Sequence, residues 1–293
     1  MDTTTNPADG VSIAYRVTAA TGTAEAAGTT EASRSNEGPE TGPIPAPDAT
    51  PIVLVHGTAL SQAIWRGFGY LKALSPDRPV VTLDLRGHGR SGKPHDESSY
   101  AMDRFVGDVL AVLDAAGIER AHYLGYSLGA RVGFSLAASH PERLASFTSL
   151  GGAPGTGRGA FDRVFFEGTV QALEHGGMAG FLAGWERASG HPLDPLTRQA
   201  FEANDPAALA AYMRANDGDP RVPDADIAAF PMPVLLLAGT RDTERLRAAE
   251  HVHSLLPHSE LHTLDAASHG DTPRHPQVIP LLKTFLERVP KVL

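Results

Sequence analysis

The chain has 293 residues, of which 42% are hydrophobic, and this apolar content suffices for one large or two small globular domains. It contains no cysteine, which excludes disulfides, thiolate metal sites and cysteine nucleophiles. The formal net charge is −9 without any block of basic residues, which argues against nucleic acid or an anionic membrane surface as a partner.

The sequence pattern of the N-terminal region predicts one strand followed by one loop. Residues 11–18 alternate apolar and polar side chains, which is typical of a half-exposed edge strand or of the first strand of a hairpin. Residues 19–50 hold almost no bulky apolar side chain, so we expect a mobile loop there. The first residues lack the pattern of a signal peptide, and no apolar run is long enough to cross a bilayer, so we expect a cytoplasmic protein with no membrane partner.

Strands and helices then alternate from residue 51 to residue 150. Continuous apolar runs at 51–55, 79–85, 121–124 and 144–150 are typical of strands buried on both faces. Helical spacing of apolar residues predicts a helix over 102–116, and a series of small residues predicts another over 128–139. Strands separated by helices predict an α/β fold with a doubly wound, mostly parallel sheet.

After residue 150 this alternation stops and later resumes. Apolar helical segments lie around 161–173, 178–185 and 207–213, with no strand pattern among them. A buried strand at 233–238 follows, then a helix over 243–256, a strand at 261–264 and a closing helix over 278–289. We therefore expect a core made of 1–150 and 231–293, carrying a helical cap over 151–230.

The junction between the strand at 121–124 and the helix at 128–139 carries a G-x-S-x-G motif from Gly125 to Gly129. Between a strand and a helix this motif forms a sharp turn that lifts the hydroxyl of Ser127 above the sheet edge. The two glycines relieve the crowding that such a turn creates. A plainer interpretation is that Ser127 only caps the helix.

The order of these motifs resembles the α/β-hydrolase superfamily. The motifs are His56-Gly57 after the first buried strand, the turn 86–91 (R-G-H-G-R-S) after the second, the 125–129 turn, the strand end 239–242 (G-T-R-D) and His269. The nearest likenesses are capped carboxylesterases, including enol-lactonases and methyl-ester hydrolases. Ser268 departs from the pattern, because glycine usually precedes the histidine.

The resemblance implies a catalytic triad of Ser127, Asp242 and His269, each just after a strand. It also implies an oxyanion hole formed by the backbone N–H groups of Thr58 and Leu128. Asp265 and Asp271 are alternative acids, and His275 is an alternative base. In such proteins the histidines of the turns at 56–57 and 86–91, His56 and His88, hold loops through hydrogen bonds, so we expect structural roles for both.

Aromatic residues are candidates for the substrate cavity, since ligand pockets are mostly apolar. We expect substrate contacts from Trp65, Tyr126, Phe165 and Trp185. Core packing is the alternative for each, and it applies equally to the other candidates, which are Phe161, Phe166, Phe181, Tyr212 and Met213. The cap holds no basic cluster, which favours a neutral, apolar substrate.

The resemblance therefore implies a serine hydrolase that cleaves a small ester or lactone through an acyl-enzyme on Ser127, with no metal and no cofactor. Ser127 at the turn disfavours aspartate-nucleophile relatives such as epoxide hydrolases. Carbon–carbon bond hydrolases, perhydrolases and thioesterases share the triad and remain alternatives, as does a non-catalytic receptor or scaffold. The sequence does not indicate an oligomeric state.

Overall fold

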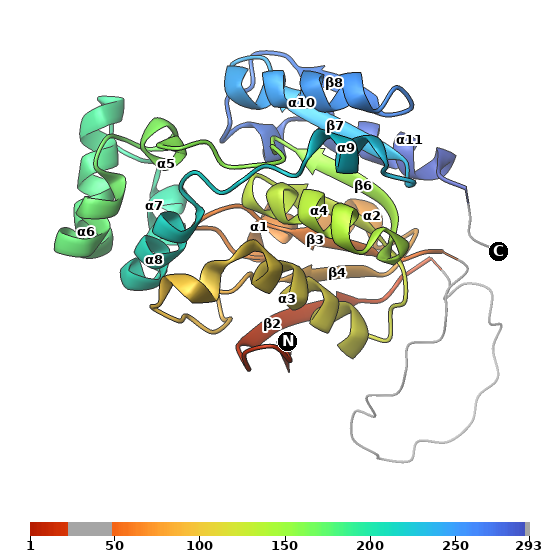
Figure 1. The fold of residues 1–293 in the computed structure, drawn as a ribbon, viewed down its shortest axis with the longest axis horizontal. Helices are drawn as coiled ribbons and strands as arrows, with labels where there is room; N and C mark the ends of the chain where they lie inside the picture. Colours follow the sequence, from red (N-terminus) through yellow and green to blue (C-terminus); the bar gives the residue numbers. More distant parts are fainter. Residues whose placement is uncertain (23–48, 291–293) are drawn as a thin grey trace.

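The computed structural model describes residues 1–22 and 49–290, so most of the expected loop at 19–50 lies outside the described residues. Within them an eight-stranded sheet forms the centre of the molecule (Figure 1). In chain order its strands are β1 (Asp2–Thr5), β2 (Ser12–Thr18), β3 (Ile52–Val55), β4 (Val80–Leu83), β5 (Ala121–Tyr126), β6 (Leu144–Leu150), β7 (Val234–Gly239) and β8 (Glu260–Leu264).

The spatial order of the strands is β1-β2-β4-β3-β5-β6-β7-β8. The pairs β1/β2 and β2/β4 are antiparallel, and each other neighbouring pair is parallel. The predicted α/β class with a mostly parallel sheet is thus confirmed.

One detail of the strand prediction was wrong. The strand expected at 11–18 is β2, but it lies inside the sheet, because β1 pairs with it and forms the edge. Residues 11–18 also do not open a hairpin, because β2 is the second strand of the hairpin that β1 begins. The sequence of β1 is Asp-Thr-Thr-Thr, which has no apolar alternation that could have revealed it.

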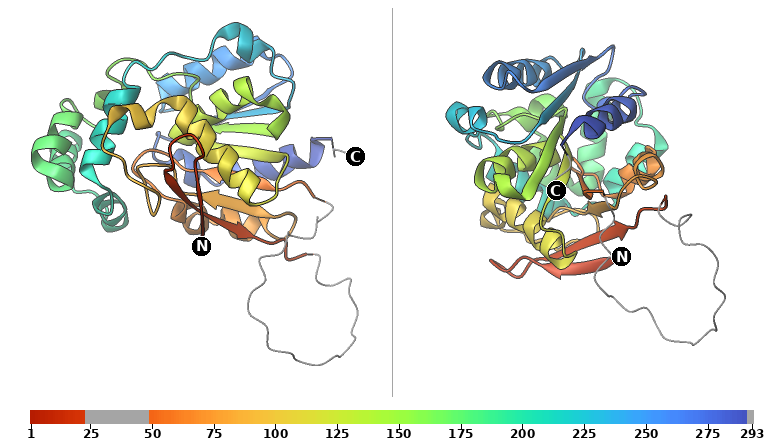
Figure 2. Two further views of the ribbon diagram at one scale, coloured as in Figure 1. Left: turned by 60° about the horizontal axis from the view of Figure 1, so that its bottom comes forward. Right: turned by 90° about the vertical axis from the view of Figure 1, so that its right-hand side faces the viewer.

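Helices cover both faces of the sheet (Figure 2). One face carries α1 (Ala63–Gly67), α2 (Tyr70–Leu74) and α11 (Val278–Arg288), and the other carries α3 (Met102–Ala115), α4 (Leu128–Ser139) and α10 (Thr243–Leu255). The alternation within β3 explains the two layers, since Val53 and Val55 join the core under α3 and α4 while Ile52 and Leu54 join the core under α2 and α11. The short helices α1 and α2 were not predicted.

The connection between β6 and β7 is helical. It contains α5 (Ala160–Val164), α6 (Thr169–Ser189), α7 (Pro195–Glu202), α8 (Pro206–Asn216) and α9 (Asp224–Ala228). Helices α5 to α8 gather beside one end of the sheet (Figure 1). The helix expected over 161–173 is broken between α5 and α6, and α6 bends at Gly177, whose φ is 59°. Helices α7 and α9 were not predicted, because each is short.

No helix among the described residues has both the length and the apolar character that crossing a membrane requires.

A buried ion pair joins the turn after β4 to helix α3. The guanidinium of Arg86 binds the carboxylate of Asp108 through two hydrogen bonds of 2.7 and 2.6 Å, and both side chains are fully buried. Arg86 also donates to Asp9 in the β1–β2 hairpin, and Asn6 donates to Asp108. This network ties three separate segments of the chain together.

We predict that Asp108→Ala lowers the free energy of unfolding by about 3 to 5 kcal/mol, because it leaves the buried Arg86 cation without its main partner. Urea unfolding followed by circular dichroism measures the change. Glu119→Gln, at an exposed position just after the same helix, is the control and should change stability by less than about 0.5 kcal/mol. Equal effects of the two substitutions would contradict the prediction.

Candidate active site

The turn between β5 and α4 holds Ser127 in a strained conformation. Its φ is 54° and its ψ is −112°, a region that non-glycine residues rarely adopt. A Cβ atom on Gly125 would collide with the backbone of Gly129, and one on Gly129 would collide with the carbonyl of Val55 at the end of β3. The side chain of Ser127 makes no capping bond to α4, so the helix-cap interpretation is wrong.

Three side chains from separate strand ends form one hydrogen-bonded chain. Nε2 of His269 lies 3.0 Å from Oγ of Ser127, and Nδ1 of His269 lies 2.5 Å from Oδ2 of Asp242. Ser127 follows β5, Asp242 follows β7, and His269 follows β8. Because these strands are parallel, their carboxyl ends lie at the same edge of the sheet. The three residues that the motifs single out are thus brought together.

The alternative acids lie elsewhere. Asp271 accepts hydrogen bonds from the backbone N–H and the hydroxyl of Ser268, and Asp265 is exposed. Ser268, the departure from the family pattern, thereby fixes the loop just before His269. His275, the alternative base, lies beyond this loop, and its Nδ1 faces only the N–H of Gln277. The described residues contain no cluster of His, Asp or Glu suited to a metal ion.

Tyr126 holds the loop that carries His269. Its hydroxyl donates to the backbone carbonyl of His269 at 3.0 Å, and the two rings lie 5.4 Å apart. Burial raises the pKa of the Tyr126 phenol, which keeps it protonated and able to donate. Tyr126 also lines the cavity, so the same side chain supports the loop of His269 and borders the site.

The loop after β3 faces Ser127. Thr58 and Leu128 both line the cavity beside it, and neither backbone N–H donates to another described residue. Ala59, next along this loop, has a φ of 59°, and its carbonyl accepts a hydrogen bond from Asn204. The hydroxyl of Thr58 lies 3.0 Å from that of Tyr212 in α8, so it joins this loop to the helices beyond β6.

The histidines of the two turns are buried and hydrogen-bonded. His56 binds the carbonyl of Gly57 through Nδ1 and accepts from the N–H of Leu85 through Nε2. His88 binds the carbonyl of Arg86. Burial lowers the pKa of His88 to about 3, which keeps the ring neutral. These contacts hold the two turns together, as expected.

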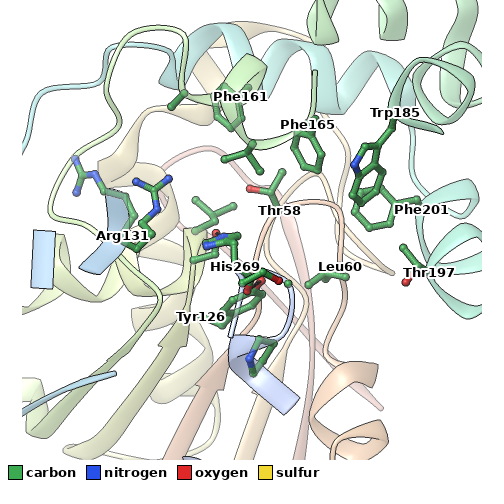
Figure 3. Close-up of a pocket in the computed structure, with 18 of the residues that line it drawn as sticks. Thr58, Leu60, Tyr126, Arg131, Phe161, Phe165, Trp185, Thr197, Phe201 and His269 are labelled. Carbon is green, nitrogen blue, oxygen red and sulfur yellow. Dashed lines mark hydrogen bonds between the residues drawn. The ribbon is translucent and has the colours of Figure 1, made fainter. Parts of the chain in front are cut away.

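A cavity of about 450 Å³ opens above Ser127 and His269 (Figure 3). Of the predicted substrate-contacting residues, it is lined by Tyr126, Phe165 and Trp185, and Phe161 and Tyr212 also line it. At its aromatic end Phe165 lies 5.3 Å and Phe201 5.0 Å from Trp185, ring centre to ring centre.

The prediction for Trp65 was wrong. Its side chain is fully buried and packs edge-on against Tyr70 under the sheet, away from the cavity. A large aromatic residue just after a buried strand can equally fill the core, and the sequence does not separate the two. Three of the other aromatic and methionine candidates are likewise core residues outside the cavity lining, namely Phe166, Phe181 and Met213.

The cavity wall also contains residues that the sequence analysis did not single out, among them Arg131, Phe201 and Arg245. A signal existed for the two arginines. Arg131 follows Ser127 by four residues in a helix, and its N–H donates to the Ser127 carbonyl, so both lie on one face of α4. Arg245 follows Asp242 by three residues in the first turn of α10.

The comparison with known proteins agrees with this arrangement. The family described as alpha/beta hydrolase fold matches residues 50–273. The solved structure of the esterase RhEst1 from Rhodococcus sp. ECU1013 superposes with a TM-score of 0.72 at 25% identity, covering 99% of each chain.

Two sequence relatives match over shorter shares of their length. The dihydrolipoyllysine-residue acetyltransferase component of the acetoin cleaving system of Pseudomonas putida is 30% identical over 225 residues, which are 75% of this chain and 58% of that protein. Epoxide hydrolase B of Mycobacterium tuberculosis (strain ATCC 25618 / H37Rv) is 37% identical over 115 residues, which are 37% of this chain and 30% of that protein.

The match to the family extends from just before β3 to the loop beyond His269, so it includes the strand ends that carry Ser127, Asp242 and His269. The chain therefore belongs to the alpha/beta hydrolase fold family.

Proposed function

We propose that this hydrolase cleaves a carboxylic ester or lactone through an acyl-enzyme formed on Ser127. The observation that carries the proposal is the hydrogen-bonded chain from Ser127 through His269 to Asp242, opening into a largely apolar cavity. Likeness to an esterase of known structure supports the same class of reaction.

The histidine acts as the general base. With Nδ1–H donating to Asp242, the ring presents the lone pair of Nε2 to the hydroxyl of Ser127. When Ser127 attacks the substrate carbonyl, His269 takes the hydroxyl proton, and Asp242 stabilises the resulting imidazolium. His269 then gives this proton to the leaving alcohol, and water, activated by the same base, releases the acid.

The negative charge on the carbonyl oxygen is held by backbone N–H groups. Those of Thr58 and Leu128 border the cavity beside Ser127 and donate to no other described residue. Donors fixed before the reaction stabilise the developing oxyanion without reorganisation. The strained turn at Ser127 supports this role, because it fixes the amide of Leu128 relative to the hydroxyl.

The helical segment 151–230 would act as a cap on a core made of 1–150 and 231–293. Phe165, Trp185 and Phe201 come from its helices or the loops between them and wall one end of the cavity. This end suits an apolar part of the substrate. Neither the reaction nor the binding of such a group requires a cofactor.

We predict that a fluorophosphonate probe labels Ser127 alone and that Ser127→Ala abolishes the labelling. A serine next to a histidine base forms a covalent adduct, whereas an ordinary hydroxyl does not. Intact-protein mass spectrometry and peptide mapping measure the adduct. Ser139→Ala, at the other end of α4, is the control and should label like the wild type. An unlabelled wild-type protein would favour a receptor or scaffold instead.

We predict that Asp242→Asn lowers kcat for a p-nitrophenyl ester by a factor on the order of 10⁴, the loss known for the equivalent change in a serine protease. The cause is that an amide no longer fixes the tautomer of His269 or stabilises its charged form. Steady-state kinetics give kcat, and thermal unfolding should show a nearly unchanged midpoint. Asp265→Asn is the control, and a crippling effect there would reject Asp242 as the acid.

A further inference from the structure

The cavity has two chemically different ends. Figure 3 shows Trp185 and Phe201 on one side of His269 and Arg131 on the other. Arg245 also lines the cavity. Both arginines come from helices of the sheet core, α4 and α10, which explains why the composition of the segment 151–230 gave no sign of them.

The guanidinium of Arg131 is fixed in place and incompletely hydrogen-bonded. It donates to Asp219 at 2.5 Å, to the carbonyl of Pro220 and to the hydroxyl of Ser135. Its Nε is buried and finds no acceptor among the described residues. The side chain is only 7% exposed. Because this Nε is buried, Arg131 contributes its positive charge to the cavity wall rather than a free donor.

Arg245 has N–H groups that donate to no described residue. Its side chain is 13% exposed, and its one hydrogen bond to a described residue is a 3.3 Å contact from Nη1 to the exposed Glu244. Glu244 also accepts from Arg163, so two guanidinium groups share one carboxylate. The Nε and Nη2 groups of Arg245 therefore remain available to a ligand.

Both cations belong to the cavity wall, which Arg131, Arg245 and Tyr212 line together. The positive charges of Arg245 and Arg131 both oppose the rise that burial causes in the pKa of the Tyr212 phenol. Burial lowers the pKa of Arg131, and the carboxylate of Asp219 opposes this effect.

The charged groups differ in whether they face the cavity. Arg131 and Arg245 line it, whereas the carboxylates that contact them, those of Asp219 and Glu244, do not. The acidic residue that lines the cavity, Asp194, caps α7, the helix that carries Phe201 at the aromatic end.

We propose that Arg131 and Arg245 form an anion subsite and that the substrate is an ester or lactone bearing a free carboxylate. This inference rests on the proposed function. The carboxylate accepts from the Nε and Nη2 groups of Arg245, and the positive charge of Arg131 adds to the attraction. The scissile carbonyl lies at Ser127, one helical turn from Arg131. An apolar part of the same substrate occupies the aromatic end. A half-ester of a dicarboxylic acid has this chemistry.

The test compares two p-nitrophenyl esters of adipic acid, one with a free carboxylate and one with that carboxylate capped as a methyl ester. We expect kcat/KM to be at least about 10-fold higher for the anionic ester, the factor that one charge-assisted hydrogen bond supplies. Arg245→Gln should remove this preference, whereas Arg247→Gln, an exposed arginine on the same helix, should keep it. Arg245 is the better residue to substitute, because Arg131 also donates hydrogen bonds to Asp219 and Pro220 and its loss would remove these structural contacts.

A binding measurement separates this inference from the proposed reaction. In Ser127→Ala, calorimetry should show monomethyl adipate binding about 10-fold or more tighter than dimethyl adipate, with the difference lost on adding Arg245→Gln. If neither p-nitrophenyl ester is turned over but this difference holds, the ester hydrolase proposal fails and the anion subsite stands. If both esters are cleaved equally well and Arg245→Gln changes nothing, the subsite is rejected and the hydrolase proposal stands.

Discussion

The site depends on the close approach of the β5–α4 turn to the end of β3. No side chain fits at Gly125 or Gly129, so helix α4 starts directly against the backbone of the neighbouring strand. That contact forces Ser127 to a φ of 54° and turns its hydroxyl outward instead of back to cap the helix. The strain is maintained because the surrounding core is packed on both faces of the sheet.

Strain recurs around the cavity. The non-glycine residues with positive φ in the described part of the chain are Ala59, Ser127 and Ala266. Ala59 follows Thr58, and Ala266 precedes the loop of His269, so each stands next to a group of the proposed mechanism. Both are held by hydrogen bonds, from Asn204 to the carbonyl of Ala59 and from the N–H of Ala266 to Thr240. Such bonds fix loop positions more tightly than propensity alone could.

Much of this arrangement follows from sequence periodicity. Buried parallel strands are continuous apolar runs, and the residues after them must meet at one edge, so the proximity of Ser127, Asp242 and His269 was predictable. Their catalytic roles remain predictions. The edge strand β1, the helices shorter than three turns and the position of Trp65 were not predictable, because they depend on tertiary contacts. For the arginine pair, the spacing from Ser127 and Asp242 was a usable signal, but it does not reveal that side chains from α4 and α10 line one cavity, which depends on tertiary packing.

The loop after β3 is held by residues of the segment 151–230 as well as by the sheet. Asn204, just after α7, binds the carbonyl of Ala59, and Tyr212 of α8 binds the hydroxyl of Thr58. Losing either contact would therefore loosen the loop that carries the Thr58 amide, although neither partner touches that amide. Substitutions in α7 and α8 that leave Ser127, Asp242 and His269 in place would then affect the proposed oxyanion donor from a distance.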